Sequence, residues 1–134
     1  MHYLRLTSTI SLCVAMSGCS TEPVVCTDQL VALTATVVNS VGQPLTGLRI
    51  SDTVVRTGAV LDVTAGAPPT DLLANGLPAA MIFSDAFIEA VLPTGDEVVV
   101  VVTAGGHSGS GRYHFGSDGC HVQKLAGPDT LVVS

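Results

Sequence analysis

The five consecutive valines at positions 98–102 constrain the fold of this chain more than any other feature. Valine branches at Cβ, which lowers its helix propensity and suits the pleated surface of a sheet. A run this apolar indicates a strand that is buried on both faces or nearly so. We therefore expect residues 97–104 to form a strand at the centre of a β-sheet.

Alternating apolar and polar residues predict further strands on both sides of this run. In residues 30–38 the side chains of Val31, Leu33, Ala35 and Val37 fall on one face, with the period of two that a strand requires. The other expected strands are residues 48–56, 59–64, 81–84, 112–115, 120–125 and 129–133. Residues 85–92 fit either a strand or a single helical turn. About seven short strands with turn signals between them are typical of an antiparallel β-sandwich, so the predicted class is all-β.

Two segments carry the residues of loops. Residues 65–78 contain two Gly- and Pro-bearing stretches that cannot sit in a central strand. We expect a long loop there, with room for a helical turn at residues 71–74. Residues 105–111 hold four glycines and are predicted to be a flexible connection.

The chain has 134 residues, of which 12% are charged, and its net charge is −6. This length predicts one compact domain. An acidic chain without a basic run argues against binding to nucleic acid. The sequence also lacks an apolar run long enough for a helix that spans a bilayer.

The N-terminal segment is predicted to be an export signal. Residues 1–18 combine one arginine with a short apolar stretch, and Met16-Ser17-Gly18-Cys19 resembles the bacterial lipobox. The resemblance implies that Cys19 becomes the mature N-terminus and carries fatty acyl chains such as palmitate. Residues 19–25 would then be a lipidated tether and residues 26–134 the β-sandwich domain. The alternative is a plain signal peptide that is cut nearby and leaves Cys19 free or in a disulfide.

The cysteine count predicts one disulfide. Cys13 leaves with the signal and Cys19 is taken by lipid, so Cys26 and Cys120 remain as an even pair in an exported chain. The competing interpretation is a zinc site made of Cys26, Cys120 and His121. It lacks a CxxC or HxxxH spacing and a fourth ligand.

Residues 36–48, with the turn Gly42-Gln43-Pro44 between two strands, resemble the opening of carboxypeptidase regulatory-like domains. In similar exported lipoproteins the domain ends in an Asp, Cys, His, Val run and a last strand, which here is residues 118–122 followed by residues 127–131. The resemblance implies a transthyretin-like sandwich that acts as a non-catalytic accessory module. Bacterial immunoglobulin-like domains also open with a Gly-x-Pro hairpin, so an immunoglobulin-like sandwich stays open as an alternative.

No constellation in the sequence predicts catalysis. Residues 106–110 resemble the G-x-S-x-G nucleophile elbow but end in Ser110 and precede a predicted strand instead of a helix. His107, His114 and His121 could converge on a metal, although surface histidines explain them more simply. The acids are spread over loop ends, where turn capping and solubility are the simpler roles; they are Asp85, Glu89, Asp96, Glu97 and Asp118.

The sequence therefore predicts a non-enzymatic module that needs no cofactor. It is expected at the cell envelope, at the outer membrane or on the periplasmic face, held by its lipid anchor and in contact with a protein partner. The first alternative is a ligand-binding lipoprotein that uses the loop at 65–78 or at 105–111. The second is an immunoglobulin-like adhesion domain, and a small hydrolase is the remote third.

Overall fold

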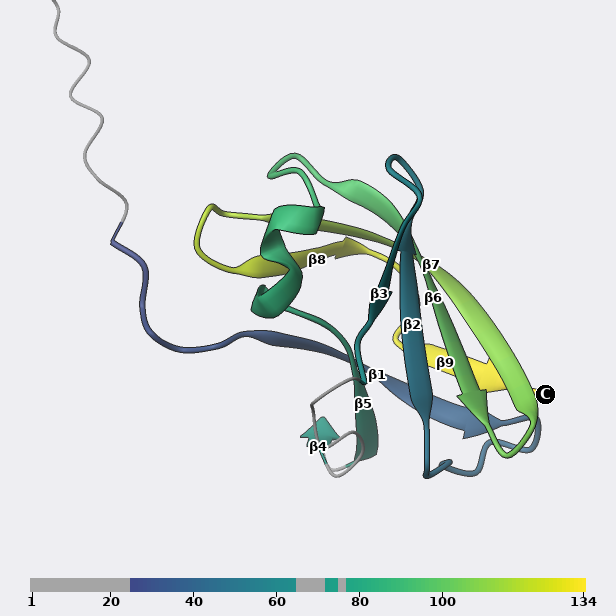
Figure 1. Cartoon of the computed structure of the whole chain (residues 1–134). Coiled ribbons are helices and arrows are strands. Elements are labelled where there is room, and N and C mark those ends of the chain that lie inside the picture. The colour runs from purple at the N-terminus through teal and green to yellow at the C-terminus, as the bar shows by residue number, and fades with distance from the viewer. Residues whose placement is uncertain (1–24, 65–71, 75–76) are drawn as a thin grey trace, which may run out of the picture.

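The computed structural model describes residues 25–64, 72–74 and 77–134. The expected signal peptide, Cys19 and all of the tether except Val25 lie outside these ranges. The protein folds as two β-sheets packed face to face (Figure 1), which confirms the all-β sandwich. No helix in the described ranges has the length and hydropathy to cross a membrane.

The larger sheet has five strands in the order β3-β2-β6-β7-β8, and all its ladders are antiparallel. Its strands are β2 (Arg49–Val54), β3 (Ala59–Asp62), β6 (Asp96–Ala104), β7 (His107–Ser117) and β8 (Val122–Ala126). The valine run lies in β6, the middle strand, as predicted. Val98, Val100 and Val102 are fully buried, whereas Val99 and Val101 on the outer face are half-buried. The run therefore fills the core from one face only.

The second sheet has the order β4-β5-β1-β9. Its strands are β1 (Ala32–Asn39), β4 (Leu72–Ala74), β5 (Leu77–Ser84) and β9 (Thr130–Val133). The expectation of a purely antiparallel sandwich is wrong at one ladder, because β9 runs parallel to β1. After β8 the chain crosses between the sheets and enters the second one beside β1, where the N–H of Thr36 donates to the carbonyl oxygen of Asp129.

The prediction of a loop at residues 105–111 is wrong for most of that segment. Only Gly105 and Gly106 form a turn, both with positive φ, and β7 begins at His107 directly opposite Ala104. Gly109 and Gly111 belong to β7, where they pair with Val102 and Val100 of β6. Both also lie close to β9, and a Cβ on Gly109 would lie 2.2 Å from the carbonyl oxygen of Val132. The sequence suggested flexibility where the structure requires a small residue.

The expected loop at 65–78 is also corrected in part. Residues 72–74 form β4, so no helical turn lies there, and β5 begins at Leu77. Pro78 is tolerated because it pairs only with β4, outside the β1 ladder. Residues 65–71 and 75–76 lie outside the described ranges. With β4 included, the described ranges contain nine strands instead of about seven.

The ambiguous segment at 85–92 is a short 3₁₀ helix, η1 (Asp85–Ala90). It joins β5 to β6 at the end of the sandwich where the described chain begins (Figure 1). We call this end the entry end, and we define it as residues 25–31, the β2–β3 turn at 55–58, η1, the turn at 92–95 and residues 116–125. The C-terminus and the turn at Gly105 and Gly106 lie at the opposite end (Figure 1).

The core between the sheets is aliphatic, with one small aromatic cluster. Phe115 lies between two other rings, with centroids 4.8 Å from Phe83 and 5.2 Å from Tyr113. All three side chains are buried. The aromatic rings therefore come from both sheets and help to hold them together.

Candidate functional site

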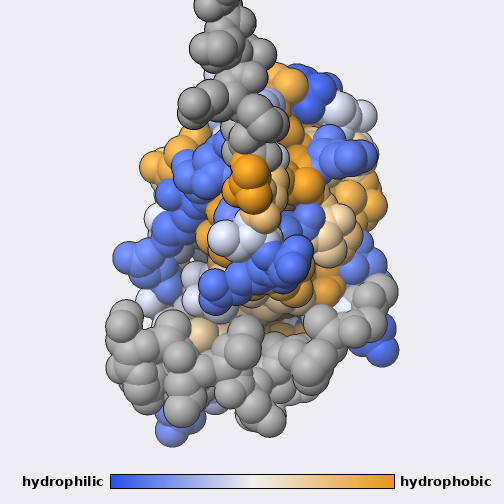
Figure 2. Space-filling model, turned by 90° about the vertical axis from the view of Figure 1, so that its left-hand side faces the viewer, coloured by the Kyte–Doolittle hydropathy of each residue, from blue (hydrophilic) through white to orange (hydrophobic). Residues whose placement is uncertain are grey.

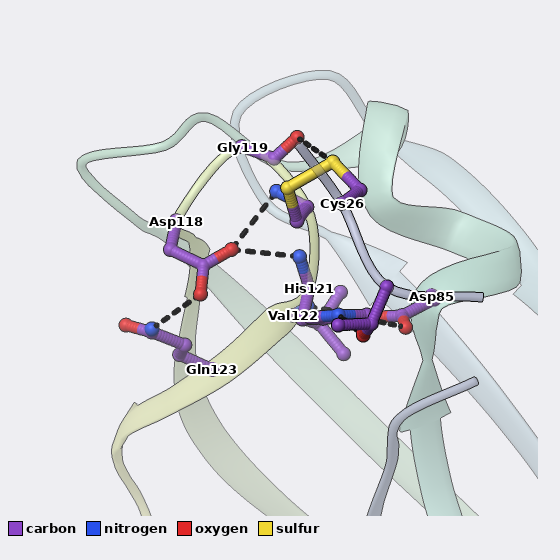
Figure 3. The surroundings of a disulfide bond; sticks show 9 residues. Cys26, Asp85, Asp118, Gly119, His121, Val122 and Gln123 are labelled. Atoms are coloured by element: carbon purple, nitrogen blue, oxygen red, sulfur yellow. Dashed lines mark hydrogen bonds and ion pairs between the residues drawn. A yellow bond between two sulfur atoms is a disulfide. The ribbon is translucent and has the colours of Figure 1, made fainter. Parts of the chain in front are cut away.

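At the entry end, several polar contacts surround the Cys26–Cys120 disulfide (Figure 3). Cys26 and Cys120 are bonded across 94 positions of sequence. This confirms the predicted pair, and it removes the competing zinc site because bonded sulfurs are not thiolate ligands. The bond connects the first described segment to the loop that precedes β8.

Asp118 shapes the loop that presents Cys120. Its Oδ1 accepts the N–H groups of Cys120 at 2.9 Å and His121 at 2.8 Å, and Gly119 between them has positive φ. These two hydrogen bonds lower the pKa of Asp118 below its ordinary value. The loop is thus an aspartate-capped turn, the role that sequence analysis gave to such acids.

Asp85 lies at the centre of a second group of contacts, which we call the clasp: Thr27, Val31, Asp85, His121 and Val122. The Asp85 carboxylate accepts the N–H of Val31 at 2.8 Å and the N–H of Val122 at 2.7 Å. Its Oδ2 lies 2.7 Å from Nδ1 of His121. Partial burial alone would raise the pKa of Asp85, but the hydrogen bonds from His121, Val122 and Val31 outweigh it and lower that pKa.

The clasp brings a hydroxyl, an imidazole and a carboxylate into the contact order of a catalytic triad. Thr27 Oγ1 lies 2.9 Å from Nε2 of His121, whose other nitrogen faces Asp85. Acyl transfer also needs N–H donors aimed at the developing oxyanion. The N–H groups of Cys120, His121 and Val122 are already donated to the carboxylates of Asp118 and Asp85. These three N–H groups are therefore not free to form an oxyanion hole, and the clasp joins the start of the described chain to η1 and β8.

A surface hollow of about 340 Å³ lies beside the clasp. Its lining consists of Val25, Cys26, Thr27, Asp118, Cys120 and His121. The hollow therefore lies beside the disulfide and the first described residues of the chain.

The three histidines that could have shared a metal do not meet. His107 begins β7 at the far end, His114 lies on β7 against Gly95, and His121 belongs to the clasp. Within the described ranges, no group of three or more His, Cys, Asp or Glu side chains could hold a metal ion.

The remaining acids have separate roles. Asp96 is buried and receives both a bidentate pair from Arg56, with both distances 2.7 Å, and the N–H of Leu92. The hydrogen bond from Arg56 is the main cause of the lowered pKa of Asp96. Glu97 pairs with Arg112 across the outer face of β6 and β7, and Glu89 is exposed on η1.

Sequence reasoning missed Asp52. This residue lies on the inner face of β2 and is fully buried, and neither oxygen has a hydrogen-bond partner among the described residues. The signal was present, because Asp52 falls between Ile50 and Val54 in the period of two that marks inward-facing positions. The clasp was missed for another reason: its members are far apart in sequence, and only the fold brings them together.

Comparison with protein-family models, with curated proteins and with solved structures found no match for this chain. Its function must therefore be argued from its own residues.

Proposed function

We propose that this chain is an exported, lipid-anchored module of the bacterial cell envelope that acts through protein contacts. The observation that carries the proposal is the Cys26–Cys120 disulfide. Structural disulfides form and persist in oxidising compartments outside the cytosol. The two bonded cysteines are those left over when Cys13 is assigned to the signal and Cys19 to the lipid.

The position of the disulfide also suits an anchored domain. The lipobox cysteine lies seven positions before Cys26, so the tether can extend at most about 25 Å. Any pull from the membrane would reach the fold first at Cys26, which is bonded to the loop before β8. A covalent bond at this point prevents β1 from being peeled from the sandwich.

A non-enzymatic role is supported by the chemistry of the clasp. Its three neighbouring N–H groups are engaged by carboxylates, which leaves them unable to stabilise an oxyanion. This agrees with the resemblance to carboxypeptidase regulatory-like domains, which implies an accessory module. A transthyretin-like sandwich is our proposal for the finer class of the fold, with the immunoglobulin-like adhesion domain as the alternative.

Ligand binding is the second candidate, and one observation favours it. A hollow of about 360 Å³ lies at the end opposite the entry end, lined by Leu45, Ala104, His107, Val133 and neighbouring polar residues. This volume would accommodate only a small ligand. The proposal of protein contacts is preferred because this small hollow explains neither the tether nor the disulfide.

The anchor is tested by fractionating cells that express the full chain and by mass spectrometry of the mature protein. We expect the wild-type protein in the membrane fraction, with acyl chains on residue 19. Cys19→Ser should lose the acyl mass and leave that fraction, whereas the matched control Cys13→Ser should keep both. A Cys19→Ser protein that stays with the membrane would contradict the lipid anchor. Crosslinking in intact cells then tests the contacts, and recovery of only abundant background proteins would count against a specific partner.

A further inference from the structure

Several exposed apolar side chains lie at the entry end. Outside residues 65–78, eight large apolar residues of the described chain are exposed, and five of them lie at this end: Val25, Leu30, Val55, Leu92 and Leu125. Figure 2 looks onto this end and shows apolar residues around the point where the chain enters. Single exposed apolar residues are ordinary, but a group of them marks an interaction surface.

Contacts hold the chain in place at four of these residues. Leu125 lies against the turn at 92–95, because a Cβ on Gly95 would come within 2.9 Å of its Cδ1. Leu92 is held by the hydrogen bond from its N–H to Asp96. Leu30 precedes Val31, whose N–H is held by Asp85, and the N–H of Val55 donates to the carbonyl oxygen of Glu97. The group is therefore presented by well-connected backbone.

The charges at this end do not suit an anionic partner. Arg56 is paired with Asp96, and His121 faces Asp85. The other charged side chains of the entry end include the exposed carboxylates of Asp28, Glu89 and Asp118, together with Lys124, which pairs with Asp129. A surface with apolar side chains and excess carboxylates matches the interface of a zwitterionic bilayer better than a polyanionic surface.

We propose that the entry end is a membrane-facing surface that rests on the lipid bilayer, with Leu30, Leu92 and Leu125 in contact with the headgroup region. This inference rests on the proposed lipid anchor at Cys19. A tether no longer than about 25 Å keeps this end closest to the bilayer. The resulting high local concentration allows a few apolar side chains to hold an orientation that they could not hold alone.

The sequence contains no tryptophan, so a single introduced tryptophan reports its own position. We would purify the full-length, lipidated protein with Leu92→Trp or Leu30→Trp and reconstitute it in phosphatidylcholine vesicles. The matched control is Val41→Trp, because Val41 is also exposed but lies in the β1–β2 connection at the opposite end. Brominated phosphatidylcholine quenches indole emission only on contact, and flotation shows whether the protein is bound.

We expect the two entry-end tryptophans to shift their emission to the blue and to be quenched about twofold by brominated lipid. The tryptophan at position 41 should keep the emission of a residue in water. If the protein floats with the vesicles and all three variants are quenched equally or not at all, the membrane-facing surface is wrong while the anchor stands. If the protein does not float, the lipid anchor fails and this inference fails with it. Circular dichroism of each variant establishes that the fold is retained.

Discussion

Asp52 is unusual because it is an acidic residue in a largely apolar core. Its carboxyl group is fully buried among valines, on the same inner face as Tyr113, whose hydroxyl also lacks a partner in the described part of the chain. A buried carboxylate without hydrogen bonds is far less stable than the neutral acid. Burial accordingly raises the pKa of Asp52 from 3.8 to about 8. The residue is therefore protonated at neutral pH.

The raised pKa makes folding stability fall as pH rises. Between the pKa of the unfolded chain, 3.8, and the folded value of about 8, the folded protein keeps a proton that the unfolded chain releases. The contribution of Asp52 to the free energy of unfolding is therefore greatest below about pH 4 and decreases by up to about 1.4 kcal/mol per pH unit toward pH 8. Asp52→Asn should flatten this dependence and stabilise the protein at mildly alkaline pH. Urea denaturation between about pH 5 and about pH 8 measures it. Glu89→Gln is the exposed control, and a slope that survives in Asp52→Asn would refute the assignment.

Asp85 has the opposite effect on the pH dependence of folding stability, because it makes the protein less stable as the pH falls into the acid range. Its hydrogen bonds lower the pKa, so its contribution to stability is present above the unfolded value of 3.8 and is lost as pH falls through the lower folded value. Asp85→Ala removes acceptors from two backbone N–H groups and from His121, which should cost about 2–3 kcal/mol at neutral pH. Glu89→Ala on the same 3₁₀ helix should change little. Thermal melting of both variants is the measurement, and equal melting temperatures would show that the clasp carries no stability.

At the scale of elements, β7 and β9 approach each other through glycine. A Cβ on Gly109 would lie 2.2 Å from the backbone oxygen of Val132, and backbone cannot move aside as a flexible side chain can. Gly109→Ala should therefore force β9 outward and destabilise the fold by about 1–3 kcal/mol. Ser110→Ala, at the next and exposed position, is the matched control. Chemical denaturation of the two variants tests this, and a neutral Gly109→Ala would mean that the strands separate at little cost.

The elements that could be predicted are those whose signals are local. The valine run placed β6 at the centre of its sheet, and the alternation in residues 30–38 found β1. The errors arose where the reason for a residue lies elsewhere in the chain. Gly109 reads locally as loop, but it is small because β9 passes over it. The parallel pairing of β9 with β1 likewise depends on a crossover between sheets that no short segment records.

At the scale of the whole molecule, the site was only half predictable. The disulfide followed from counting, because few cysteines remained once the signal and the lipobox were assigned. The clasp did not follow, since Thr27, Asp85 and His121 are separated by 58 and 36 positions and carry no shared motif. Together the disulfide and the clasp join the start of the chain to both η1 and β8.

The disulfide should therefore be the largest single contribution to the stability of the entry end. It closes a loop of 94 positions, for which the chain-entropy model gives about 4–5 kcal/mol. We expect the Cys26→Ser and Cys120→Ser double variant to remain folded, because the valine core and both sheets are intact, but to melt well below the wild-type protein. Reducing the wild-type protein with dithiothreitol should produce the same shift.

If the double variant and the reduced wild-type protein melt at the same temperature, the loss of stability is due to the missing covalent link and not to the substitutions themselves. The reduced protein retains both sulfurs and changes only the link, whereas the double variant also alters packing around residue 120. If reduction leaves the melting temperature unchanged, the loop is already constrained in the unfolded chain, or the clasp alone holds the entry end. Asp85→Ala in the reduced protein distinguishes these cases. If the clasp alone holds the entry end, this substitution should unfold the entry end, whereas it should not do so if the loop is already constrained in the unfolded chain.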